Sequence, residues 1–182
     1  MASLVKEYAK ADAAGRVKLI YSNFSNFLGI IESSIDGLVY IIENEKATNR
    51  RIANGDLGVR IQTGRKSDIT GDTASGNVDT KKAIVICDFS GGILDGTDRG
   101  EEFKREAFLL KRMRRDYQLF NDQLGNLDEK DRQLLVGYMR SHNDVVEIAD
   151  EMGIAADSVR KQVFRTKQKV VKETIRCMEG RL

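Results

Sequence analysis

The stretch that decides the fold is Asn143–Val170, NDVVEIADEMGIAADSVRKQVFRTKQKV. It contains two apolar runs at helical spacing, and between them lies Gly153, which can adopt the left-handed backbone of a tight turn. We expect Ile154 to insert into the core at this turn. The first run is formed by Val145 or Val146, Ile148, Ala149 and Met152, and the second by Val159, Val163, Thr166 and Val170. Two helices joined by a short turn with glycine predict a helix–turn–helix, the motif that many proteins place in the DNA major groove.

The charge of the second helix agrees with this prediction. Residues 158–176 carry seven cations against Glu173, a net charge of +6, whereas residues 128–157 carry a net charge of −5. The nearly neutral total of +2 therefore conceals one strongly basic helix. Phosphates favour cations clustered on one side of a helix, which distinguishes this helix from an ordinary solvated one.

We predict that this helix binds double-stranded DNA through its first turns. In this interpretation Arg160, Lys161 and Gln162 read base edges, while Arg165 and Lys169 contact the phosphate backbone. The predicted contact residues are Ser158, Arg160, Lys161, Gln162, Arg165, Lys167 and Lys169.

Two longer helices are expected before this segment. The clearer one begins near Asp98, which can cap it, and ends at Gly125. Its apolar stripe has helical steps of three and four: Phe103, Ala107, Leu110, Met113, Tyr117, Phe120 and Leu124. The opposite face is basic. A further helix is expected from Asp128, as its cap, to about Ser141, with Leu134, Leu135, Tyr138 and Met139 facing inward.

The N-terminal part has a wide apolar stripe that predicts one continuous helix from Val17. The stripe consists of Ile20, Phe24, Phe27, Ile31, Ile35, Leu38 and Ile42. A helix this apolar needs a partner, which can be the rest of the chain, a second copy or another protein. We favour self-association and expect a homo-oligomer. On that basis, removal of residues 1–48 should leave a folded 82–182 fragment with weaker DNA binding.

The middle of the chain is rich in glycine and predicts a linker over residues 49–81. Within it, residues 57–62 alternate weakly like a strand. Residues 82–89 could be helix or strand, and Asp79 and Thr80 as caps favour helix. The predicted divisions are an N-terminal helical or oligomerisation segment (1–48), a linker (49–81), a middle helical segment (82–125) and the DNA-binding domain (126–182).

Composition supports an all-α chain. There is no proline or tryptophan among 182 residues, and aromatic residues make up 7%. Such a composition disfavours a β-sandwich or barrel. Two cysteines and one histidine are too few for a disulfide framework or a zinc motif of two histidines, and we expect free thiols.

At the C-terminus the residues resemble region 4 of sigma-70-type factors. The resemblance is carried by LDEKDRQLL (127–135), VVEIADEMGI (145–154) and SVRKQVFRTKQKV (158–170). It covers about 55 residues and implies a helix–turn–helix that binds promoter DNA and contacts RNA polymerase. A similar motif occurs in LuxR-type regulators.

The chain lacks the tryptophan-bearing aromatic cluster of sigma region 2. A region-4-like end behind a helical N-terminus is similar to phage and prophage late-gene activators of the RinA and ArpU type, which also place segments like LGVRIQ (57–62) and SDIT (67–70) between helices. We therefore expect an activator. A divergent sigma factor, or a module that binds polymerase or sigma with little DNA contact, is the alternative.

Other classes have little support in the sequence. No glycine loop ends in the Gly-Lys-Ser/Thr of phosphate-binding loops, and the carboxylates near residue 98 lack the rhythm of a calcium loop. We expect no enzyme activity, no catalytic or metal-binding residues and no cofactor. The N-terminus does not resemble a signal peptide, and polar residues interrupt the most apolar stretch. We therefore expect a cytoplasmic protein without a membrane span.

Overall fold

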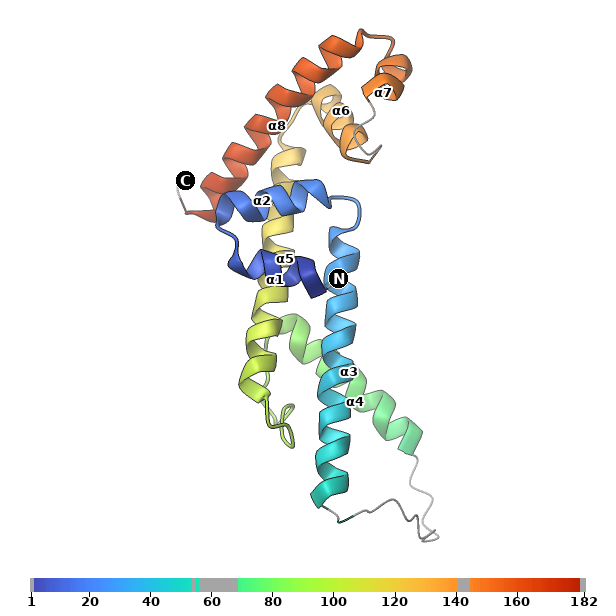
Figure 1. Cartoon of the computed structure of the whole chain (residues 1–182), viewed down its shortest axis with the longest axis vertical. Helices are drawn as coiled ribbons and strands as arrows, with labels where there is room; N and C mark the ends of the chain where they lie inside the picture. Colours follow the sequence, from blue (N-terminus) through green and yellow to red (C-terminus); the bar gives the residue numbers. More distant parts are fainter. Residues whose placement is uncertain (1, 54, 56–68, 141–144, 181–182) are drawn as a thin grey trace. The chain divides into compact units, whose positions relative to one another are not determined.

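The computed structural model describes residues 2–53, 55, 69–140 and 145–180, and within these residues all regular structure is helical (Figure 1). The all-α prediction is confirmed. The helices are α1 (Ala2–Lys10), α2 (Ala13–Ser22), α3 (Phe27–Ala53), α4 (Ile69–Ile86), α5 (Gly100–Gly125), α6 (Glu129–Arg140), α7 (Val145–Met152) and α8 (Ala156–Met178).

The helices form two compact units that do not follow the predicted order of segments. The first unit combines residues 1–30 with residues 113–182, and the second contains residues 31–112. Helices α3 and α5 contribute residues to both units. The N-terminal helices therefore belong to the same unit as the predicted DNA-binding helices, which differs from the predicted divisions at 48, 81 and 125.

The first unit is built around α8. Helix α2 packs against α8, α1 packs against α2, and α6, α7 and α8 pack on one another. Five aromatic rings form a cluster in this unit, and neighbouring rings have centroids 5.7–6.0 Å apart: Tyr8, Phe24, Phe27, Tyr117 and Phe120. Because aromatic side chains bury the largest apolar areas, this cluster is a major part of the core of the unit.

The predicted helix from Val17 is interrupted at residues 23–26. The side-chain amide of Asn23 donates to the Leu19 carbonyl oxygen (2.9 Å), and the Asn26 N–H donates to the Asn23 carbonyl oxygen (2.9 Å). These bonds replace the helical ladder, which is the usual way in which asparagine competes with a helix. The apolar residues are buried on both sides of the break. Their spacing therefore predicted correctly which side chains are buried, but the prediction of one continuous helix was wrong.

The second unit has its core between α3, α4 and the beginning of α5. Ile35, Leu38, Ile42, Ile84 and Phe103 are among its buried side chains. Glu45 on α3 accepts hydrogen bonds from the backbone N–H groups of Asp98 and Arg99, at 2.7 and 3.1 Å, and pairs with the Arg99 guanidinium. The N-terminus of α5 is therefore held by a carboxylate from another helix, while the Asp98 carboxylate accepts a hydrogen bond from Asn49.

The predicted linker is partly helical. Helix α4 begins at Ile69, so residues 69–81 are not a linker, and Thr80 lies inside the helix and not at its cap. The Thr80 side chain is buried and donates a 2.6 Å hydrogen bond to Glu43, which gives this residue a tertiary role. The predicted strand at residues 57–62 lies outside the described residues. Of the SDIT segment (67–70), the structure describes only residues 69 and 70, which begin α4.

The apolar stripe on α2 and α3 is buried within the chain. Ile20, Phe27, Ile31 and Ile42 have no exposed side-chain area, and the remaining stripe residues are at most 8% exposed. The stripe is therefore not the exposed surface that we expected for self-association, and the homo-oligomer stays a prediction.

No single helix in the described part of the chain is long and apolar enough to cross a membrane, although α2 and α3 together have the required length and composition as a pair bent by 102°.

Candidate nucleic-acid interface

The turn between α7 and α8 is closed by the backbone. Gly153 has a φ of +63°, its N–H donates to the Asp150 carbonyl oxygen (3.3 Å), and the Ile154 N–H donates to the Ala149 carbonyl oxygen (3.1 Å). This pair of bonds is the Schellman arrangement that ends many helices, and it requires a residue that tolerates positive φ. The side chain of Ile154 is 37% exposed, so the expectation that it inserts into the core is wrong.

The inner face of α8 is the predicted one. Val159, Val163, Thr166 and Val170 are buried, and Thr174 extends the face by one turn. On α7, Ile148 and Ala149 are buried against the same unit. Helices α7 and α8 pack on each other, and the small Ala149 side chain is buried in this unit.

The outer face of α8 carries a stripe of exposed cations. Lys161, Arg165, Lys169, Lys172 and Arg176 follow one another at steps of four, four, three and four, and all are exposed. We call these five residues the basic stripe. Ser158 is exposed at the beginning of the same face. Lys172 and Arg176 were not among the predicted contact residues, although their helical spacing from Arg165 could have identified them.

The other predicted contact residues lie elsewhere on α8. Gln162 donates a 2.7 Å hydrogen bond to Asp131 of α6, and the Lys167 ammonium lies 4.0 Å from the centre of the Tyr21 ring on α2. Arg160 is exposed but pairs with Asp157 at 2.8 Å. The structure therefore brings Ser158, Lys161, Arg165 and Lys169 together and separates Arg160, Gln162 and Lys167 from them.

A buried polar network holds the N-terminal helices on α5. The Tyr8 hydroxyl donates a 2.6 Å hydrogen bond to Asp116, and Arg16 Nε lies 3.1 Å from the same carboxylate oxygen. The second contact lacks hydrogen-bond alignment, so it is an ionic contact. Burial, followed by the bond to Asp116, raises the pKa of Tyr8 well above its ordinary value. The network joins α1 and α2 to α5, and α2 in turn packs on α8.

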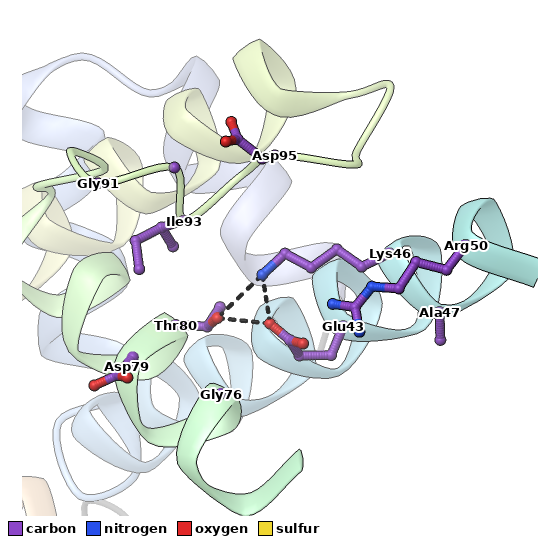
Figure 2. A pocket seen from close by; sticks show the side chains of 11 residues that line it. Glu43, Lys46, Ala47, Arg50, Gly76, Asp79, Thr80, Gly91, Ile93 and Asp95 are labelled. Carbon is purple, nitrogen blue, oxygen red and sulfur yellow. Dashed lines mark hydrogen bonds and ion pairs between the residues drawn. The ribbon is translucent and has the colours of Figure 1, made fainter. Parts of the chain in front are cut away.

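The second unit contains a polar pocket of about 600 Å³, drawn in Figure 2. At its base Lys46 contacts Glu43 (2.7 Å) and Thr80 (3.5 Å). Burial alone would raise the pKa of Glu43, but hydrogen bonds from Lys46 and Thr80 outweigh it and lower the pKa below its ordinary value. Asp79, Asp95 and Arg50 complete the charged lining. Two cations and three carboxylates line this pocket, so charges of both signs are mixed here, unlike the excess of cations on α8.

The described residues contain no group of three or more His, Cys, Asp or Glu side chains that could hold a metal ion. Cys87 and Cys177 are both free thiols.

No protein-family model, no curated protein and no solved structure matches the chain.

Proposed function

We propose that this chain is a sequence-specific DNA-binding transcription regulator that binds promoter DNA through a sigma-region-4-like helix–turn–helix formed by α7 and α8. The basic stripe is the single observation that carries this proposal. It places five cations on the solvent side of α8, directly opposite the buried inner face. An α-helix rises 1.5 Å per residue, so the stripe from Lys161 to Arg176 extends over about 22 Å, enough to meet several phosphates.

The residues of the stripe have different roles in this proposal. The beginning of α8 enters the major groove, where Ser158 and Lys161 meet base edges. Arg165, Lys169, Lys172 and Arg176 contact phosphates and fix the register of the helix on the duplex. The Gln162–Asp131 hydrogen bond favours a different role from the predicted base contact, namely holding α8 on α6.

Selection from a library of random DNA duplexes of about 20 base pairs tests this function, followed by affinity measurements at two salt concentrations. We expect enrichment of one sequence motif and an affinity that falls steeply with salt. If the four cations assigned to phosphates each neutralise one, log K should change with log salt by a slope of about −3.6. Absence of an enriched motif, together with a flat salt response, would refute the proposal.

Contact with RNA polymerase is the second part of the proposal. The sequence lacks tryptophan and any segment resembling the promoter-melting module of a sigma factor, which supports an activator that joins DNA to polymerase. Transcription of a supercoiled promoter with core polymerase and this protein should then require a housekeeping sigma factor. Specific initiation with core polymerase alone would instead identify a divergent sigma factor, and polymerase binding without DNA binding would identify a protein-binding module.

A further inference from the structure

Helix α8 carries a second stripe on another side, of which Arg160 and Phe164 are exposed and Lys167 and Val171 are half-buried. Arg160, Phe164, Lys167 and Val171 follow at steps of four, three and four. With 3.6 residues per turn, this stripe lies roughly a third of a turn away from the basic stripe. Phe164 is 60% exposed, which is unusual for a side chain of this size inside a well-formed helix.

Two adjoining pockets run beside this second stripe, and both lie within the first unit. They have volumes of about 200 and 550 Å³ and share the side chains of Tyr21, Tyr138 and Lys167. Phe164 and Arg160 line the smaller pocket, while Lys18 and Val171 line the larger one. We call the two pockets together the α2–α8 groove. Its wall combines aromatic rings from three helices with the ends of long cationic side chains.

The charge of the α2–α8 groove has one sign. Lys18, Arg160 and Lys167 line it, and no carboxylate does so in the described part of the chain. Asp157, the partner of Arg160, lies outside the lining, and both members of that pair are exposed to solvent, where such a pair contributes little stability. Arg160 can therefore exchange this partner for another carboxylate.

Tyr21 provides a further polar group at the centre of the groove. Its hydroxyl is buried and has no hydrogen-bond partner among the described residues. Burial, followed by the proximity of Tyr138, raises the pKa of Tyr21 to about 12, so the phenol remains a neutral donor. A buried donor without a partner costs free energy.

We propose that the α2–α8 groove binds an acidic segment of a partner protein that inserts an aromatic or aliphatic side chain against Phe164. Carboxylates of the segment pair with Lys18 and Arg160 while Lys167 stays on the Tyr21 ring, and the apolar side chain of the segment covers the exposed Phe164 ring. Duplex DNA is the less suitable occupant, because its phosphate surface offers no apolar group for Phe164 and Val171. The inference adds a protein-binding face to the proposed DNA-binding face of α8.

The test compares two ligands on two sets of variants. The peptide probe is a fluorescent segment of about twelve residues in which Asp and Glu surround one Phe and two Leu, with a Gln/Asn version of the same length as its control. The DNA probe is a duplex of about 20 base pairs. Lys18→Glu and Phe164→Ser change the groove at exposed positions, and Lys169→Glu is the matched charge reversal on the basic stripe.

We expect the acidic peptide to bind the full-length protein and its neutral version to bind more weakly. Lys18→Glu and Phe164→Ser should each weaken peptide binding by about fivefold or more, and Lys169→Glu should leave it unchanged. DNA binding should show the opposite pattern. Failure of the acidic peptide to bind, or equal loss with Lys169→Glu, overturns the groove proposal. If the unmodified protein did not bind the DNA probe, the proposed function would be overturned instead. Failure of the groove proposal and failure of the proposed function are therefore distinguishable.

Discussion

At the scale of single residues, the cations of α8 differ in what holds them. Arg165 and Lys169 lie on the exposed basic stripe, whereas Lys167 rests on the Tyr21 ring. A side chain already engaged inside the protein loses that contact when it turns toward a ligand. The burial and partners of each residue therefore decide which of the predicted contact residues remain suitable for DNA.

We predict that Arg165→Ala lowers the affinity for every DNA sequence and reduces the salt slope by about 1. Lys161→Ala should instead relax sequence preference, at a cost of about 1–3 kcal/mol at one base pair. Fluorescence anisotropy with matched and mismatched duplexes separates these effects, and Lys10→Ala, an exposed cation on α1, serves as the control.

Gln162→Ala tests whether Gln162 holds α8 on α6 and does not read a base. The substitution should lower stability slightly through loss of the Asp131 contact and leave base preference unchanged. A change of the preferred base in Gln162→Ala would restore the role that the sequence predicted for this residue.

A second prediction concerns the buried network around Asp116. Tyr8→Phe removes one donor and should lower the free energy of unfolding by about 1–3 kcal/mol. Asp116→Ala leaves the buried Arg16 without its ionic partner and should cost about 3–5 kcal/mol. Urea unfolding followed by circular dichroism measures both values. Equal and small losses would show that the network contributes no more than ordinary surface contacts.

At the scale of elements, the turn before α8 depends on one glycine. Gly153 has a positive φ. The N–H groups of Gly153 and Ile154 donate the two backbone hydrogen bonds that end α7. An added Cβ would meet no atom within 4 Å, so only the backbone conformation opposes a substitution here. Sequence reasoning identified this residue because glycine is the usual choice at such a position.

We predict opposite outcomes for two glycine substitutions. Gly153→Ala should destabilise the protein by about 1 kcal/mol, because alanine disfavours positive φ. Gly137→Ala, inside α6 where an added Cβ also meets nothing, should stabilise it by about 0.5–1 kcal/mol through helix propensity. Thermal unfolding of both variants gives the comparison. Stabilisation by Gly153→Ala would mean that α7 and α8 are joined by a different turn.

At the scale of the whole molecule, the two ends of the chain fold into the same compact unit. Residues 113–182 share a compact unit with residues 1–30, and α2 packs on α8. The folded C-terminal fragment expected from the sequence would therefore lose part of its own core. Tyr8, Val17, Ile20 and Phe24 are all buried in that unit.

We predict that deletion of residues 1–26 destabilises the remaining chain by roughly 5 kcal/mol or more, because several fully buried side chains are lost. The deletion variant should bind a hydrophobic dye and melt without a sharp transition. Tyr40→Ser, at a side chain that is 71% exposed on α3, is the control and should unfold like the original protein. A deletion variant with an unchanged cooperative transition would show that the N-terminal helices are dispensable.

Local patterns in the sequence were sufficient for much of the secondary structure. The apolar spacing and the capping residues predicted α5 and α6 within one or two residues, and Asp128 caps α6 as expected, accepting the Asp131 N–H at 2.9 Å. It also predicted which face of α8 is buried. These features depend on neighbours three or four residues apart, and such neighbours are visible in the sequence.

Tertiary structure alone decided where the long-range partners lie. No local pattern indicates that Gln162 bonds to Asp131, that Lys167 rests on Tyr21, or that Glu45 holds the beginning of α5. Helix α4 forms although its segment contains glycine. The burial of Thr80, Ala83 and Ile84 in the core outweighs the weak helix propensity of the segment. The sequence therefore determined which residues are cationic and where α5 and α6 lie, whereas packing determined α4 and which of the cations remain available to a ligand.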